Sequence, residues 1–435
     1  MDLKKVLQDA GILGAGGAGF PSYAKLAEGA DLLVINGAEC EPLLETDYYL
    51  LREHLHEMTE GARLLCEAWG IGACVLGIKQ HNAWRLGWSD RQMLGFVQVR
   101  VLPDVYPMGD EINLIYEATG RLVQPGALPI TQGVIVYNVE TLVNIYRAMT
   151  EGAPVTLKYL TVGGAIDQPI VTAVPVGTPV RVLFERLGIT VPADCGVLDG
   201  GPSMGRLIHP ESAVVSKTTK SLLILPRSIP AMVSKLRTPQ NHEAIASSVC
   251  CQCTRCTDMC PRNLLGYPLE PHRHVRMTSR TAAFEPQSVI DATLCCGCGI
   301  CEIAACCQQI SPCTVIRGHK ALLAQNKMRF TAKEQVQVRP ERAYRMMPSE
   351  RWKSLLGVRV YDKPAAFRAI SVGDTPLEIA LHPHIGAPSV AAVAVGDEVA
   401  AGQMIAAAGA GLSLPQHAPR AGRVLAVDDT RILIG

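Results

Sequence analysis

Most of the cysteines of this 435-residue chain fall in one short block, since twelve of the sixteen lie between Cys250 and Cys313. The first half of the block, CCQCTRCTDMCP, fits the spacing C-x2-C-x2-C-x3-C-P with Cys250, Cys253, Cys256 and Cys260. In proteins with two [4Fe-4S] clusters, the first three cysteines of such a run bind one cluster and the fourth binds the other. A structural zinc site needs only two C-x-x-C pairs, so the triple spacing favours iron-sulfur clusters over zinc.

The second half of the block repeats this spacing at Cys295, Cys298 and Cys301 but departs from it at the fourth position. Ala305 stands where the fourth cysteine is expected. Three cysteines follow it, and we favour them as the fourth ligand in the order Cys306, Cys307 and Cys313.

Exchange of the fourth ligands predicts two sets of four. One cluster takes Cys250, Cys253, Cys256 and Cys306, and the other takes Cys295, Cys298, Cys301 and Cys260. Free cysteines usually pack as small apolar side chains, and we interpret Cys251, Cys296 and Cys313 in this way. The block therefore predicts an electron carrier.

Charge and hydropathy exclude several classes of partner. The chain has 41 basic and 40 acidic side chains, and a net charge of +1 provides no field that would attract nucleic acid. No apolar stretch approaches the roughly 20 residues of a membrane span. Clustered cysteines in a chain without a signal peptide indicate metal ligation in a reducing compartment, so we expect a cytoplasmic protein without a membrane span.

Composition and hydrophobic periodicity divide the chain into five regions. Residues 1–150 alternate apolar runs such as DLLVINGA with helical stretches, which indicates an α/β domain, and residues 151–235 indicate a small α+β domain. The cysteine block spans residues 245–316, and residues 369–435 contain short Val/Ala runs typical of a β domain. Between them, residues 317–368 carry many basic side chains, and we interpret this segment as a solvated connector, with a docking surface for anions as the alternative.

The segment GAGGAG at residues 14–19 matches G-x-G-x-x-G, but a helical pattern precedes it and the first strand follows it, so a Rossmann fingerprint is excluded. Three further motifs follow: NGAECEP at 36–42, YPMGDEINLIYEATGR at 106–121 and NVETL at 138–142. In this order, the four motifs resemble the FMN-binding domain shared by the NADH-oxidising subunit of complex I and the Rnf electron-transport C subunit. The resemblance implies FMN as a cofactor and NADH as the electron donor.

The resemblance also implies a set of cofactor-binding residues. The glycine loop and Lys25 would hold the phosphate and ribityl chain of FMN, and Glu111 would be the catalytic residue of a Gly-Glu-Glu triplet in which Asp110 replaces the first Glu. The full set is Gly14, Gly16, Gly17, Gly19, Lys25, Asn36, Glu39, Glu41, Gly109, Asp110, Glu111, Asn138 and Thr141.

The other regions resemble parts of the same relatives. Residues 151–235 are similar to a β-grasp soluble-ligand-binding domain, the cysteine block to a helical two-cluster ferredoxin domain, and residues 369–435 to a barrel-sandwich hybrid. No lysine follows Lys363, so the last domain cannot carry biotin or lipoate as an amide. We interpret His382, His384 and His417 in that domain as turn or surface residues.

The order of the domains resembles the cobalamin reductase family of the propanediol-utilisation microcompartment. The resemblance implies an oxidoreductase that passes electrons from NADH through FMN and two [4Fe-4S] clusters to corrinoid cobalt, with a cobalamin adenosyltransferase and microcompartment shell proteins as partners. A flavin is required because nicotinamide donates two electrons together, whereas clusters and cobalt exchange one. The alternatives are an Rnf-type electron-transport protein and a cluster-bearing scaffold without NADH activity.

Overall fold

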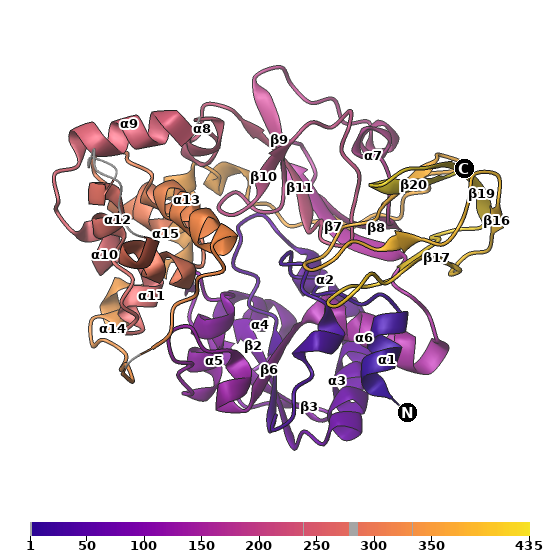
Figure 1. The fold of residues 1–435 in the computed structure, drawn as a ribbon, viewed down its shortest axis with the longest axis horizontal. Coiled ribbons are helices and arrows are strands. Elements are labelled where there is room, and N and C mark those ends of the chain that lie inside the picture. The colour runs from indigo at the N-terminus through magenta and orange to yellow at the C-terminus, as the bar shows by residue number, and fades with distance from the viewer. Residues whose placement is uncertain (1, 238, 278–285, 333) are drawn as a thin grey trace.

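The computed structural model describes residues 2–237, 239–277, 286–332 and 334–435, and its amino-terminal third forms a five-stranded sheet in the order β3-β4-β2-β1-β6 (Figure 1). All neighbours in this sheet are parallel except β3 and β4. The strands are β1 (Leu32–Asn36), β2 (Ala73–Lys79), β3 (Met93–Leu94), β4 (Val97–Leu102) and β6 (Val134–Asn138). The runs predicted as strands in residues 1–150 are therefore confirmed.

Both faces of this sheet are buried, as expected for parallel strands. Leu33 and Ile35 face one core, which is covered by α1 (Leu3–Asp9), α2 (Thr46–Glu53), α3 (Leu55–Trp69), α4 (Gln80–Leu86) and α6 (Val139–Glu151). Leu32 and Val34 face a second core, which contains α5 (Glu111–Thr119) and apolar side chains of the cysteine region. The cysteine region is thus packed directly on the first domain.

The second region forms a six-stranded mixed sheet in the order β10-β9-β11-β7-β8-β13, packed against α7 (Val180–Leu187). Its strands are β7 (Leu157–Gly164), β8 (Ile170–Pro175), β9 (Cys195–Asp199), β10 (Arg206–Ile208), β11 (Ser221–Pro226) and β13 (Ala366–Phe367). The last strand comes from far along the chain and adds to the sheet edge beside β8.

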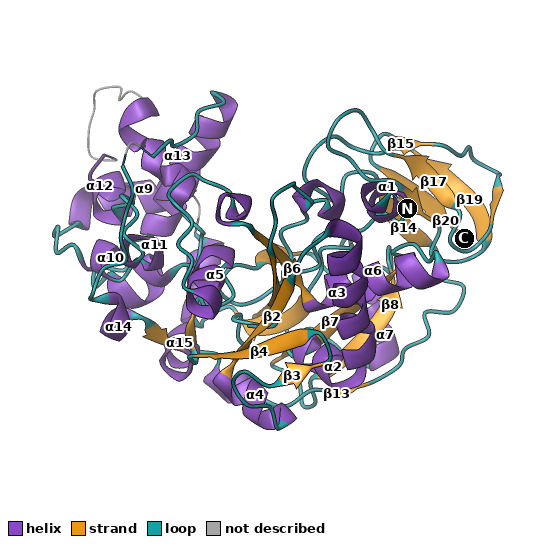
Figure 2. Ribbon diagram, turned by 90° about the horizontal axis from the view of Figure 1, so that it is seen from below, coloured by secondary structure: helices purple, strands orange, loops and turns teal. Residues whose placement is uncertain are grey.

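The cysteine region is helical and has no β-strand among its described residues (Figure 2). It contains α8 (Pro230–Leu236), α9 (Pro239–Val249), α10 (Arg255–Asp258), α11 (Pro261–Leu264), α12 (Pro271–Met277), the 3-10 segment η3 (Pro286–Leu294), the π-helical turn η4 (Cys301–Ala305) and α13 (Pro312–Gln325). Helix α13 runs across the expected domain limit at residue 316.

The expectation of a solvated connector after the cysteines is wrong. The segment forms α14 (Arg342–Arg345), β12 (Met347–Pro348) and α15 (Ser349–Leu356), and β12 pairs with β5 (Val105–Tyr106) of the first domain. Trp352 is 1 % exposed, and its ring stacks on Tyr106 with 4.7 Å between centroids. The many basic residues conceal an apolar helix face, because Trp352 and Leu356 are one turn apart and both are buried.

The carboxyl-terminal domain consists of two small sheets around one core, in the orders β14-β20-β19-β16 and β15-β17-β18. Its strands are β14 (Leu377–Ala380), β15 (Val390–Ala391), β16 (Glu398–Val399), β17 (Met404–Ala407), β18 (Gln416–His417), β19 (Gly422–Val427) and β20 (Arg431–Ile434). In both views, this domain and the cysteine region lie at opposite ends of the protein. The fold class predicted from the sequence is confirmed.

His384 and His417 are not surface residues, because they are only 5 % and 8 % exposed. They lie near the buried Lys217, whose Nζ donates to Gly11 O at 3.0 Å. This contact region joins the carboxyl-terminal domain to the amino-terminal segment, and Ile385 N also donates to Gly19 O at 2.9 Å. Among the described residues, no helix is both long and apolar enough to cross a bilayer.

Candidate functional site

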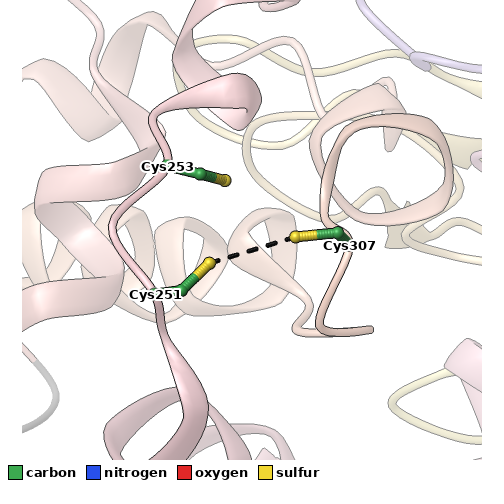
Figure 3. A group of neighbouring side chains, drawn as sticks. All are labelled: Cys251, Cys253 and Cys307. Carbon is green, nitrogen blue, oxygen red and sulfur yellow. Dashed lines mark hydrogen bonds between the residues drawn. The ribbon is translucent and has the colours of Figure 1, made fainter.

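The cysteines of the block line two separate cavities. The first lies between the loop before α10 and the turn after η4, and its cysteines are Cys250, Cys251, Cys253, Cys256, Cys306 and Cys307. It therefore brings together the four thiols that the sequence assigns to one cluster. Cys253 also lies with Cys251 and Cys307 in a group whose sulfur atoms are within 4.8 Å of one another (Figure 3).

The second cavity contains the thiols that the sequence assigns to the other cluster. Its cysteines are Cys260, Cys295, Cys296, Cys298, Cys301 and Cys313. Cys260 immediately precedes α11, where Pro261 starts the helix and directs the cysteine away from the first three ligands of its own run. The exchange of Cys260 and Cys306 between the two runs is consistent with this arrangement.

The three candidates for the irregular fourth ligand are divided between the cavities. Cys306 and Cys307 line the first cavity, whereas Cys313 lines the second together with Cys295 and Cys301. Cys306 is half-buried and packs against the same small apolar cluster as Cys250, while Cys307 is exposed. The donor set fits iron-sulfur clusters, because each cavity holds at least four thiols and its lining contains no carboxylate to bind a harder metal.

A third cavity, of about 180 Å³, lies where the first domain, the second sheet and the cysteine region meet. Asn36 and Asn138 line it from the carboxyl ends of β1 and β6, where the two residues are register partners on adjacent parallel strands. Ligands of open α/β sheets bind at this edge. Asn36 Nδ2 donates to Gly109 O at 2.9 Å, which holds the loop before α5 against the cavity.

Buried charges surround the cavity. Lys220 forms a close ion pair with Asp47 and lies 3.9 Å from Glu39 Oε2. Burial and the neighbouring Asp47 raise the pKa of Glu39 against the opposing effect of Lys220, which favours the protonated form of this carboxyl. Glu39 Oε2 is buried without a hydrogen-bond partner among the described residues, and an unsatisfied polar atom at a cavity wall fits a polar ligand.

A hydrogen bond to α6 holds the glycine loop (residues 14–19) in place. Ala15 N donates to Thr141 Oγ1 at 3.0 Å, and Lys158 Nζ lies 3.4 Å from Ala15 O. Lys158 is itself paired with Glu140 at 2.5 Å, and both side chains are 1 % exposed. Gly16 then lies at the cavity beside Asn138, with φ values of +97° and +66° at Gly17 and Gly19 that favour glycine. The loop therefore presents its backbone at Gly16 to the cavity.

The structure therefore places some of the predicted cofactor-binding residues in the lining of the cavity and others outside it. Seven line the cavity: Gly16, Asn36, Glu39, Glu41, Gly109, Asp110 and Asn138. The other six lie outside its lining: Gly14, Gly17, Gly19, Lys25, Glu111 and Thr141. Lys25 and Glu111 form an ion pair with each other at 3.0 Å, and Lys25 also donates to Val136 O.

An ion pair joins this cavity to the second cysteine cavity. Asp110, at the N-cap of α5, accepts from Arg262 at 2.7 Å, and Arg262 lines the second cysteine cavity. Cys296 and Cys298 line both cavities. The site expected to hold FMN and the site expected to hold a cluster thus share a wall.

Sequence reasoning missed several residues of this cavity. Asp47, Lys220, Met204 and Cys40 line it, and Lys220 and Met204 come from the second region of the chain. Glu41 also connects the first domain to the second region, because its carboxylate accepts hydrogen bonds from Ser203 N and Met204 N, each at 2.9 Å. No local motif marks Asp47, Lys220 or Met204, whereas Cys40 lies inside the NGAECEP motif without being among its predicted binding residues. Only the packing of two domains brings Lys220 and Met204 to this cavity.

Comparisons with known proteins agree with this arrangement. Three family models match: a Nuo51 FMN-binding domain over residues 7–147, a 4Fe-4S dicluster domain over residues 249–311 and an RnfC barrel sandwich hybrid domain over residues 366–435. The cavity residues Gly16 to Asn138 of the first domain all lie inside the first match. The cofactors FMN and [4Fe-4S] are therefore supported.

Similar proteins extend over the whole chain. It is 36% identical to a cobalamin reductase PduS from Salmonella typhimurium over 100% of this chain and 96% of that protein. It is 35% identical to a cobalamin reductase PduS from Citrobacter freundii, over 99% and 96%. The C subunit of a Na(+)-translocating ferredoxin:NAD(+) oxidoreductase complex from Acetobacterium woodii is 32% identical over 60% of this chain and 58% of that protein.

Proposed function

The chain belongs to the cobalamin reductase PduS family, and from this premise we propose that it is an NADH-dependent oxidoreductase that reduces corrinoid cobalt. One observation carries the proposal: the cavity of the FMN-binding domain and the second cysteine cavity share Cys296 and Cys298. A flavin in the FMN-domain cavity and a cluster in the second cysteine cavity would therefore be separated only by the wall that these two residues form.

The chemistry that FMN supplies when bound is the conversion of a hydride donation into single electrons that a cluster can carry. The residues of the chain position it. Asn36 and Asn138 present side-chain amides from neighbouring strand ends, and the glycine loop presents backbone amides at Gly16. The raised pKa of Glu39 favours its protonated form, which can donate a hydrogen bond to a ligand in the cavity.

Lys25 and Glu111 act differently from the residues at the cavity wall in this proposal. Their ion pair at 3.0 Å holds the start of α5 against the end of the 3-10 segment η1 (Ser22–Lys25), which follows the glycine loop. We propose that Glu111, the last residue of the Gly109-Asp110-Glu111 triplet, supports catalysis. Its side chain contacts Lys25. Lys25 neutralises negative charge near the strand ends of the sheet.

We propose Cys250, Cys253, Cys256 and Cys306 as the ligands of the first cluster and Cys260, Cys295, Cys298 and Cys301 as those of the second. The lining of the two cavities supports this division. We also propose that residues 1–150, 151–235, 245–316 and 369–435 form four domains. Residues 317–368 connect the last two of these, and they pack on the first domain through β12 and add β13 to the second sheet.

The family membership supports a role in 1,2-propanediol utilisation, with the protein in the cytoplasm inside a bacterial microcompartment. An adenosyltransferase that captures the reduced corrinoid and the shell proteins of that compartment are the proposed partners. An Rnf-type role is less well supported, because the match to the Acetobacterium woodii protein extends over 60% of the chain, whereas the PduS match extends over 100%.

The experiment that tests this function uses the purified, cluster-reconstituted protein under anaerobic conditions. We expect a flavin absorption spectrum, roughly eight iron atoms per chain for two cubanes, and reduction of cob(III)alamin that requires NADH. A protein without flavin, or one that reduces cobalamin equally well without NADH, would contradict the proposal.

A further inference from the structure

The two cysteine cavities differ in their exposure to solvent. In the second, Cys260, Cys298, Cys301 and Cys313 are all buried, and two of the lining residues are shared with the FMN-domain cavity. In the first, Cys251, Cys253 and Cys307 are exposed. The second site therefore faces the electron source, and the first site is the one that an external acceptor can approach.

The exposed thiols lie on one face. Cys251 and Cys253 come from the loop before α10, Cys307 comes from the turn after η4, and the sulfur atoms of Cys251 and Cys307 are 3.9 Å apart (Figure 3). Gln252, Thr254 and Gln308 lie between and beside them and are also exposed. We define this exit face as Cys251, Gln252, Cys253, Thr254, Cys307 and Gln308.

The six residues of the exit face are polar and uncharged, and two arginines lie at its rim: the exposed Arg255 follows Thr254, and Arg237 donates to Gln309 O. The lining of the first cavity contains no Lys, Arg, Asp or Glu, and its one histidine, His272, is paired through Nδ1 with the Thr257 hydroxyl at 2.7 Å. Amide and hydroxyl side chains both donate and accept hydrogen bonds. A corrin ring is rimmed by acetamide and propionamide groups, which these side chains can pair with, whereas a highly charged protein partner would require complementary charges.

From this asymmetry we propose that a free corrinoid docks on the exit face and receives its electron from the cluster of the first cavity. The inference rests on the proposed function and adds the acceptor site to it. Oxidation of one NADH to NAD⁺ and H⁺ releases two electrons, and each reduces one cobalt from Co(III) to Co(II). Electron flow then runs from the FMN-domain cavity through the second cysteine cavity to the first.

The test compares Gln308→Trp, which places a bulky ring on the exit face, with the matched control Gln168→Trp on an exposed turn between β7 and β8. We expect Gln308→Trp to raise the KM for aquacobalamin at least tenfold. NADH-driven reduction of ferricyanide, which needs no corrinoid site, should be unchanged in both variants. Equal KM values for cobalamin in Gln308→Trp and wild type would overturn the proposal.

A second readout is independent of turnover. Cys251 is exposed and is not among the proposed ligands. The rate at which iodoacetamide alkylates it, measured by mass spectrometry, therefore falls when a ligand covers the exit face. Cyanocobalamin, whose cobalt is already capped by cyanide, should slow this alkylation in the wild type but not in Gln308→Trp. A cysteine installed as Gln168→Cys should be alkylated at the same rate with and without cyanocobalamin.

The outcomes separate the inference from the function on which it rests. A wild-type protein that does not reduce cobalamin contradicts the proposed function itself. A wild-type protein that reduces cobalamin while Cys251 is unprotected overturns the docking site alone. Protection that requires a corrinoid-carrying protein instead of free cyanocobalamin also overturns it, in favour of a protein partner. If Gln308→Trp loses iron, the protection of Cys251 by cyanocobalamin in the wild-type protein tests the proposal without the variant.

Discussion

Arg262 and Asp110 form a buried ion pair, with 2.7 Å between Nη2 and Oδ1 and side chains that are 11% and 12% exposed. Arg262 lies in the cysteine region and Asp110 in the FMN-binding domain, so the pair crosses the wall between the two redox sites. Asp110 and Asn138 also begin α5 and α6 as N-caps, and each therefore helps to fix the shape of the cavity.

Replacing Arg262 by Gln should destabilise the protein by roughly 3–5 kcal/mol, because it leaves Asp110 as a buried charge without its partner. The matched control is Arg121→Gln, which breaks a more exposed pair with Asp31 and should cost less than about 1 kcal/mol. Urea unfolding of both variants measures the difference. Equal losses in the two variants would contradict the importance of the buried pair.

The same replacement should also change the second cluster. Loss of a cation at the lining of its cavity makes an added electron less favourable, so its midpoint potential should fall. A redox titration followed by electron paramagnetic resonance should show this fall for one cluster signal only. A shift of both signals, or of neither, would argue against the assignment of Arg262 to the second cavity.

The irregular fourth ligand can be identified by single substitutions. Replacement of Cys306 by Ser should reduce the iron content from roughly eight to roughly four atoms per chain, because Cys306 is half-buried beside Cys250 in the first cavity. Replacement of Cys307 or Cys313 should leave both clusters in place. Iron analysis together with cluster signals checks this, and loss of a cluster only in the Cys307 variant would transfer the assignment to that residue.

Lys220 should be essential to the cavity, although it lies outside the FMN-binding domain. Its replacement by Met leaves Asp47 and Glu39 together without a cation, and removal of one member of a buried pair typically costs about 3–5 kcal/mol. We expect lower stability and FMN that is lost on gel filtration. A second variant, Lys220→Arg, keeps the charge and should retain more flavin; equal flavin content in Met and Arg variants would contradict this role.

The histidines of the carboxyl-terminal domain predict a loss of stability in acid. Burial lowers the pKa of both His384 and His417 to about 4, with Lys217 as a neighbouring cation. The unfolded chain binds protons at these residues below about pH 6.5, whereas the folded chain does not. Their contribution to stability is therefore present above pH 6.5 and is lost as the pH falls toward 4.

A double variant with Gln at positions 384 and 417 removes both titrating groups. Its free energy of unfolding should fall by roughly 4–5 kcal/mol less than that of the wild type between pH 7 and pH 4.5, about half of it from each histidine. Urea unfolding at several pH values measures this slope. Identical slopes would show that other groups cause the acid sensitivity.

Local patterns were sufficient for the parts of this fold that depend on neighbouring residues. The strand ends at Asn36 and Asn138 follow directly from apolar runs, and the exclusion of a Rossmann loop agrees with a glycine segment placed between α1 and η1. The cysteine spacing likewise predicts which thiols gather in each cavity. These features are encoded within short windows of the chain.

Other features depend on contacts between distant segments. Lys220 reaches Asp47 across 173 positions, and neither residue belongs to a motif. The expectation of a solvated connector over residues 317–368 rests on their many basic side chains. It is wrong because Trp352 and Leu356 have the spacing of a buried helix face within this segment. His384 and His417 are buried only because the last domain packs on the amino-terminal segment, which composition does not reveal.

The central claim is that electrons from NADH reach cobalt through the clusters. The most direct test is an anaerobic titration of Cys256→Ser and Cys298→Ser proteins that each retain FMN. We predict that the wild type forms two cob(II)alamin per NADH, whereas both variants lose cobalamin reduction and keep NADH-driven ferricyanide reduction. Cobalamin reduction at the wild-type rate in the variants would contradict the account, because the flavin would then reduce cobalt directly.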